Sequence, residues 1–255
     1  MKKIFCLGLI GMLSFGASSF TKVEPTSQPM SNPYVQGAHI NVQSEVKVST
    51  KEVKDSKEAY KINLQIPVLE GIQDTKIQTS INTFIEKDAL AFAEEIKIQG
   101  LEFAIDSKKQ GWKVRPYEAS TSYKVTYKQK NIVSIACTYY RDTLGAHGNS
   151  EIKTFNFDLN TGKQLALKDL FDENENYLSV INGEIQKQIK LNPTEYFSEK
   201  DQGFASIRSD QPFGIEDGNV IIYFDPYEIA PYSTGAPQFK LPFSLFKGGA
   251  KTGVI

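Results

Sequence analysis

Histidine and cysteine are scarce in this sequence, with two of each among 255 residues. A zinc site needs three or four protein ligands, so one here would have to be assembled from carboxylates far apart in the chain. A G-x-S-x-G elbow, a P-loop, a dinucleotide-binding glycine pattern and a calcium loop are all missing as well. The sequence therefore predicts no metal and no cofactor, and it favours a protein that is not an enzyme.

The first residues have the pattern of an export signal. Lys2 and Lys3 precede an apolar run over 4–15, and small residues follow at 17–19. This order predicts a signal peptide over 1–19 and a secreted or extracytoplasmic, envelope-associated protein. A retained membrane anchor is the alternative, since the apolar run nearly reaches the length that spans a bilayer. No later segment is apolar enough to do so, so we expect no membrane span after signal removal.

Loss of the signal changes the charge and the cysteine count. The 29 basic residues less Lys2 and Lys3 give 27 against 30 acidic residues, a net charge of −3. A chain with a net negative charge is not expected to bind nucleic acid. Cys6 is removed with the signal, which leaves Cys137 alone and excludes an internal disulfide. Apolar residues alternate around Cys137, so we expect it to be a buried core side chain.

The remaining chain divides into a tether and two modules. Residues 20–43 contain three prolines and no regular spacing of apolar residues, which predicts a tether. The first module, 44–144, starts with two alternating segments that predict a hairpin. Asp74 then caps a helix with an apolar stripe, and Gly100 is expected to end it. Two more strands follow, joined by a polar turn at 129–131.

The second module, 145–255, is expected to repeat this order. The segment 152–167 predicts a strand, a turn at 160–162 and a short second strand. Asp172 is expected to start a helix whose apolar stripe includes Ile181 and Ile185. A hairpin turning at Asp217 and Gly218 completes the module. The predicted fold class is therefore α+β, with two strand-helix-strand modules and mainly antiparallel sheets.

One local candidate for acid–base chemistry exists. His147 lies in "DTLGAHGNSE", five residues after Asp142, and this pair would serve a hydrolase. The glycines on both sides of His147 instead favour a tight turn between strands, in which the imidazole hydrogen-bonds the turn. We therefore interpret His147 as structural and keep a hydrolase as the alternative function.

The stretch "YFDPYEIAPYSTGAPQFKLPF" at 223–243 is unusually rich in aromatic residues and proline. Pro226 and Pro231 fix φ and remove backbone donors, which predicts a rigid loop, and "PQFKLPF" is expected to return as an edge strand. Tyr227 and Tyr232 are of the type enriched at binding hot spots, although Tyr227 could instead pack over the sheet with Ile229 and Phe239. The predicted ligand-binding residues are Tyr227, Pro231, Tyr232, Ser233, Thr234, Gly235 and Pro237.

Four segments carry a resemblance to a known family: "GAHG" at 145–148, "FNFDLNTGKQL" at 155–165, "LFD" at 170–172 and "YFDPYEIAPYSTGAPQFKLPFS" at 223–244. They resemble the RsiV-type extracellular domain, which is also similar to the region before the catalytic domain of PdaC. The resemblance implies a non-catalytic α+β domain outside the cytoplasm that, in RsiV, captures lysozyme. The expected function is therefore a binding or sensing module for a lysozyme-like protein or for peptidoglycan, with a purely structural envelope protein as a further alternative.

Overall fold

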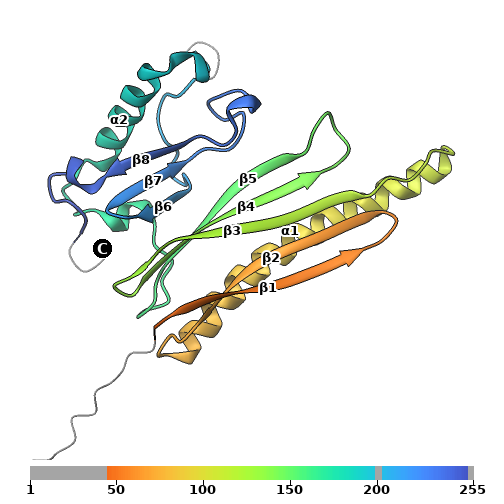
Figure 1. The fold of residues 1–255 in the computed structure, drawn as a ribbon, viewed down its shortest axis with the longest axis horizontal. Helices are drawn as coiled ribbons and strands as arrows, with labels where there is room; N and C mark the ends of the chain where they lie inside the picture. The colour runs from red at the N-terminus through yellow and green to blue at the C-terminus, as the bar shows by residue number, and fades with distance from the viewer. Residues whose placement is uncertain (1–44, 199–202, 252–255) are drawn as a thin grey trace, which may run out of the picture. The chain divides into compact units, whose positions relative to one another are not determined.

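A five-stranded sheet covered by one long helix makes up the first half of the fold (Figure 1). The structure is a computed structural model that describes residues 45–198 and 203–251. The predicted signal peptide at 1–19 and tether at 20–43 lie outside the described residues. The elements of this half are β1 (Lys47–Ser56), β2 (Tyr60–Glu70), α1 (Thr75–Lys109), β3 (Tyr117–Gln129), β4 (Ile132–Asp142) and β5 (Asn149–Asp158).

The strand order in this sheet follows the chain, β1-β2-β3-β4-β5. β1 pairs antiparallel with β2, which confirms the predicted hairpin. β3 and β4 are also antiparallel, and Lys130 and Asn131 form their tight turn with positive φ. β2 and β3 run parallel, because α1 carries the chain back to the end of the sheet at which β2 began. The fold class is α+β as predicted, but this sheet is mixed.

Helix α1 begins as predicted and ends later than predicted. The Asp74 side chain accepts hydrogen bonds from the backbone N–H groups of Lys76 and Ile77, which caps the first turn. Gly100 was expected to end the helix and instead lies buried within it. A Cβ atom at this position would lie 2.5 Å from the carbonyl oxygen of Ala59. Glycine therefore permits the close approach of α1 to the start of β2, and the helix continues to Lys109.

Strand β5 belongs to the five-stranded sheet. The sequence assigned it to the second module, which was expected to start at 145. β5 pairs with β4 from Asn149 to Asp158, so the first sheet continues beyond 144. The predicted turn at 160–162 brings Gln164 back to form an isolated bridge with Phe157. Within β4, Cys137 is buried as predicted, and burial raises the pKa of its thiol to about 12.

The second sheet is antiparallel, in the order β6-β7-β8, and packs against α2. The predicted hairpin turns at Asp217 and Gly218, and β8 is an edge strand as expected. Asp172 does not cap α2, because the helix begins later and Asn176 accepts the hydrogen bond from the Ser179 N–H. The elements are α2 (Tyr177–Leu191), β6 (Phe213–Glu216), β7 (Asn219–Tyr223) and β8 (Gln238–Pro242).

Buried polar side chains join the two sheets. The Ser134 hydroxyl on β4 accepts a hydrogen bond of 3.0 Å from the Ile215 N–H on β6. The Asn156 amide on β5 donates one of 2.8 Å to the carbonyl of Phe213. Residues 43–255 belong to one compact unit, so the boundary between the two predicted modules stays a prediction. Within the described residues, no helix has both the length and the apolar character required to cross a bilayer.

Candidate ligand-binding site

Three aromatic rings from distant parts of the chain stack on one another. His147 comes from the turn between β4 and β5, and Tyr227 and Tyr232 come from the connection between β7 and β8. The ring centroids are 4.0 Å apart for His147 and Tyr232, and 5.5 Å apart for Tyr227 and Tyr232. Tyr227 is 48% exposed and Tyr232 38% exposed, and His147 is also exposed. We call these three residues the aromatic patch.

Hydrogen bonds within the protein determine which atoms of the aromatic patch can still accept a hydrogen bond from a ligand. Nδ1 of His147 lies 2.8 Å from the carbonyl oxygen of Gly148, and because a carbonyl only accepts, Nδ1 must carry the proton. In the neutral imidazole Nε2 then accepts from the Tyr227 hydroxyl at 3.1 Å. The Tyr232 hydroxyl donates to the same Gly148 carbonyl at 3.3 Å. Both hydroxyl protons are therefore committed within the protein, and the hydroxyl oxygens are left to accept from a ligand.

A tight turn presents Tyr227 to solvent. The Asp225 N–H donates a 2.9 Å hydrogen bond to the Glu228 carboxylate, and the Glu228 N–H donates back to the Asp225 carbonyl at 3.1 Å. Pro226 fixes the first corner of this turn. Tyr227 at the second corner has φ of +68°, a left-handed conformation that is unusual for a residue with a side chain. Such strain is found mostly where the surrounding contacts and the function of a site require it.

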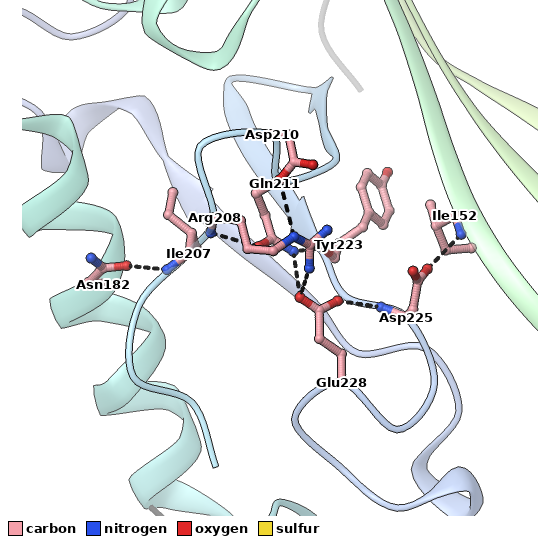
Figure 2. Close-up of polar contacts among 9 residues, drawn as sticks. All are labelled: Ile152, Asn182, Ile207, Arg208, Asp210, Gln211, Tyr223, Asp225 and Glu228. Atoms are coloured by element: carbon pink, nitrogen blue, oxygen red, sulfur yellow. Dashed lines mark hydrogen bonds and ion pairs between the residues drawn. The ribbon is translucent and has the colours of Figure 1, made fainter. Parts of the chain in front are cut away.

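A polar network holds this turn in place (Figure 2). The Arg208 guanidinium contacts the Glu228 carboxylate, and its Nε donates to Asp210 at 3.1 Å. The Gln211 side chain is buried, and its amide donates to the Tyr223 carbonyl at 2.7 Å, just before the turn. The segment that contains Arg208 and Gln211 therefore supports the turn by charge and by hydrogen bonds.

A second contact ties the turn to β5. The Asp225 carboxylate accepts a 2.7 Å hydrogen bond from the Ile152 N–H (Figure 2). Burial raises the pKa of this carboxyl group, although the hydrogen bond from Ile152 acts in the opposite direction. Because Ile152 lies only a few residues after His147, this bond keeps the tyrosine loop close to the His147 turn.

The other predicted binding residues lie at the tip of the loop. Tyr232–Thr234 form a short 3₁₀ turn that starts after Pro231, and Gly235 ends it with φ of +77°. The Thr234 hydroxyl donates to the Glu195 carbonyl at 3.0 Å. Ser233 is exposed, whereas Pro237 is buried. The structure thus brings Tyr227, Tyr232 and Ser233 to the surface and gives Pro237 a packing role.

Comparisons with known proteins match two separate segments of the chain. Residues 53–150 match the family model described as "Deacetylase PdaC", and residues 168–244 match the one described as "Protein of unknown function (DUF3298)". The anti-sigma-V factor RsiV of Bacillus subtilis (strain 168) is 28% identical over 75% of this chain and 66% of its own length. The peptidoglycan-N-acetylmuramic acid deacetylase PdaC of the same strain is 25% identical over 69% of this chain and 36% of its own length.

The chain contains an RsiV-like and PdaC-like region. It spans about two thirds of RsiV and about a third of PdaC. Two solved structures of DUF3298 proteins share the fold. The protein from Bacteroides fragilis NCTC 9343 has a TM-score of 0.61 at 18% identity, with 80% of this chain and 92% of that chain covered. The protein from Pseudomonas aeruginosa PAO1 has a TM-score of 0.57 at 18% identity, with coverages of 82% and 95%.

The aromatic patch joins the two matched segments of the RsiV-like region. His147 lies within 53–150, and both tyrosines lie within 168–244. The sequence predicted a binding role for Tyr227 and Tyr232 but treated His147 as an independent turn residue. It did not single out Arg208, Asp225 or Glu228, although the spacing of Asp225 and Glu228 around Pro226 is typical of a tight turn. The position of Arg208 opposite Glu228 is a tertiary contact that no local pattern reports.

The hydrolase pair of the sequence analysis does not form a hydrogen-bonded unit. Asp142 accepts from the Leu144 N–H at 2.8 Å, within its own turn. Both ring nitrogens of His147 are engaged, by Gly148 and by Tyr227. In the part of the chain that the structure describes, no group of three or more His, Cys, Asp or Glu side chains has the arrangement of a metal site.

A cleft of about 550 Å³ opens beside the polar network, along β5. Its charged side chains have partners within the protein: Lys153 pairs with Asp88 at 3.1 Å, and Arg208 pairs with Asp210 and Glu228. The charges of the cleft are therefore compensated within the protein, whereas the aromatic patch presents exposed ring faces, and we take the patch as the candidate binding surface.

Proposed function

We propose that this chain is a non-catalytic, extracytoplasmic binding module that captures a lysozyme-like protein through the aromatic patch. The observation that supports this proposal is the exposure of three stacked rings, two of them on a loop held by Arg208, Asp225 and Glu228 and the third, His147, on the neighbouring turn. Rigid aromatic side chains bury a large area on binding and lose little conformational entropy. The hydroxyl oxygens of the patch accept hydrogen bonds, and the ring faces attract cations, so a partner with exposed Lys or Arg side chains fits best.

The RsiV-like region supports the choice of partner. The resemblance noted in the sequence implies lysozyme capture by the extracellular domain of RsiV, which is 28% identical to this chain over 75% of its length. Both tyrosines lie in the segment that matches the DUF3298 family model. The predicted signal peptide would bring the module to the compartment in which such a protein is met.

A cell-wall glycan is the second candidate. PdaC acts on the N-acetylmuramic acid of peptidoglycan, and its similarity to this chain includes the His147 turn. Stacked rings with hydroxyl groups at their edges also suit a sugar, because the apolar face of the sugar covers a ring while its hydroxyl groups donate hydrogen bonds.

Titration of the exported form with hen egg-white lysozyme, and separately with a soluble peptidoglycan disaccharide-peptide, tests the proposal. We expect lysozyme binding that Tyr232→Ala weakens by about 1 to 3 kcal/mol with little change in melting temperature. Trp112→Ala, an exposed aromatic in a different part of the fold, is the matched control and should bind like the wild type. Binding of the peptidoglycan fragment alone would select the second candidate. If neither ligand binds, or if Tyr232→Ala binds both unchanged, the proposed function is wrong.

A further inference from the structure

Helix α1 has a second apolar face that does not contact the sheet. Its buried residues, among them Ile85, Ile96 and Ala104, face the strands. Leu90, Ile98, Leu101 and Ile105 are exposed. At about 100° per residue these four fall within an arc of about 80°, on the side of the helix away from the buried residues. Exposed apolar residues aligned in this way mark an interaction surface more often than scattered ones do.

The apolar stripe leads to an exposed tryptophan. Trp112 is 65% exposed and is the single tryptophan of the chain. It follows Gly111, whose φ of +71° reverses the chain. The backbone N–H of Trp112 donates a hydrogen bond of 2.8 Å to the Ser107 carbonyl. The turn therefore holds the indole at the end of α1. We call Ile98, Leu101, Ile105 and Trp112, with the basic residues around them, the helix-end surface.

Two basic residues of the helix-end surface, next to Trp112, keep their positive charge unpaired in the part of the chain that the structure describes. Residues 97–115 contain five basic residues and two acidic ones, but Lys97 pairs with Asp55 at 2.9 Å and with Glu94 at 4.0 Å. Lys108 pairs with Glu58, and Lys109 pairs with Asp106. Lys113 and Arg115 are exposed and have no acidic partner within 4.0 Å among residues 45–198 and 203–251. An occupant of this surface is therefore expected to be anionic.

We propose that the helix-end surface docks on an anionic lipid bilayer. Trp112 and Ile105 would enter the boundary between head groups and acyl chains, where tryptophan is enriched, and Lys113 and Arg115 would contact lipid phosphates. A second copy of the chain would bring two basic surfaces together, and a purely polar polyanion would leave the apolar stripe in water. An anionic bilayer offers phosphates to the basic side chains and an apolar boundary region to the apolar stripe.

The single tryptophan makes the test direct. The exported form is mixed with vesicles of phosphatidylcholine alone, or of phosphatidylcholine and phosphatidylglycerol in equal parts. With the anionic vesicles we expect a blue shift of the tryptophan emission and co-sedimentation, both reduced by salt. The double variant Lys113→Glu, Arg115→Glu should lower the partition coefficient by roughly tenfold or more. Tyr232→Ala is the matched control and should partition like the wild type.

Two outcomes would overturn the proposal. One is vesicle binding that the double variant leaves unchanged, since another surface would then be responsible. The other is no binding to the anionic vesicles, and a dimer that Ile105→Ser dissociates would then assign the apolar stripe to a second copy. Circular dichroism of each variant checks that its fold is retained. Because lysozyme is not part of this assay, its result is independent of the proposed function.

Discussion

The imidazole of His147 lies against the ring of Tyr232, with their centroids 4.0 Å apart. This contact connects a turn of the five-stranded sheet to the loop that precedes β8. If the aromatic patch binds the partner, His147→Ala should weaken lysozyme binding by about 1 kcal/mol, because Tyr232 loses its stacking partner. His147→Phe, which restores a ring, should recover most of that loss. Calorimetric titration of both variants measures this effect, and equal affinities for the alanine variant and the wild type would contradict it.

Tyr227 offers a test that separates backbone strain from ring contacts. Glycine adopts a φ of +68° freely, whereas alanine does not, so Tyr227→Gly should be about 1 kcal/mol more stable than Tyr227→Ala. Both variants lack the ring and should lose ligand affinity equally. Urea unfolding and titration of the pair measure the two effects, and equal stabilities would show that the left-handed conformation is not retained in solution.

Replacement of Gly100 by alanine should lower the stability of the fold, whereas the same replacement at an ordinary helical glycine raises it. Helix propensity alone would favour Gly100→Ala by about 1 kcal/mol. The added Cβ would lie 2.5 Å from the Ala59 carbonyl oxygen, and we expect the overlap to destabilise the fold by about 2 kcal/mol. In α2, a Cβ atom at Gly183 would meet nothing within 4 Å, so Gly183→Ala should be stabilising by about 0.5 to 1 kcal/mol. Thermal unfolding of both variants makes the comparison, and a stabilised Gly100→Ala would refute the close approach of helix and strand.

Glu216 should make stability depend on pH in the acid range. Hydrogen bonds from Lys124 and then Lys240 hold the pKa of this carboxyl group below its ordinary value of 4.5. Its contribution is therefore present above the ordinary pKa and is lost as the pH falls through the lower pKa of the folded state. Glu216→Gln should be less stable than the wild type at about pH 7, and the difference should shrink as the pH falls below the ordinary carboxyl pKa. Urea unfolding over a series of pH values measures the difference, and a constant gap would show that the ion pairs contribute nothing.

The sequence predicted the parts of the fold that depend on local patterns. The Asp74 cap, the turns at Lys130 and Asp217 and the burial of Cys137 each follow from residues next to one another in the chain. Gly100 was misread because a glycine that ends a helix and one that admits a neighbouring strand are identical in a single sequence. Asp172 was misread because several acidic residues precede α2, and only the backbone shows that Asn176 is the cap.

The candidate site was predicted only in part, because sequence patterns report local features and not tertiary contacts. Two prolines and two tyrosines in one loop indicate a rigid binding element, so Tyr227 and Tyr232 could be selected from sequence. The packing of His147 against them depends on how the two sheets are joined, through contacts such as that between Asp225 and Ile152. No period or spacing in the chain reports a contact between residues so far apart.

The parallel pairing of β2 with β3 has a consequence for how the chain folds. The hairpin β1–β2 and the meander β3–β4–β5 each bring together neighbouring strands, and such local contacts form quickly. Tyr60 can meet Tyr117 only after the whole of α1 has closed the loop between them. We therefore expect the rate-limiting step to be the docking of two preformed sheet fragments under one helix. A substitution at the junction of α1 and β2, such as one at Ala59, should slow folding more than one within either hairpin.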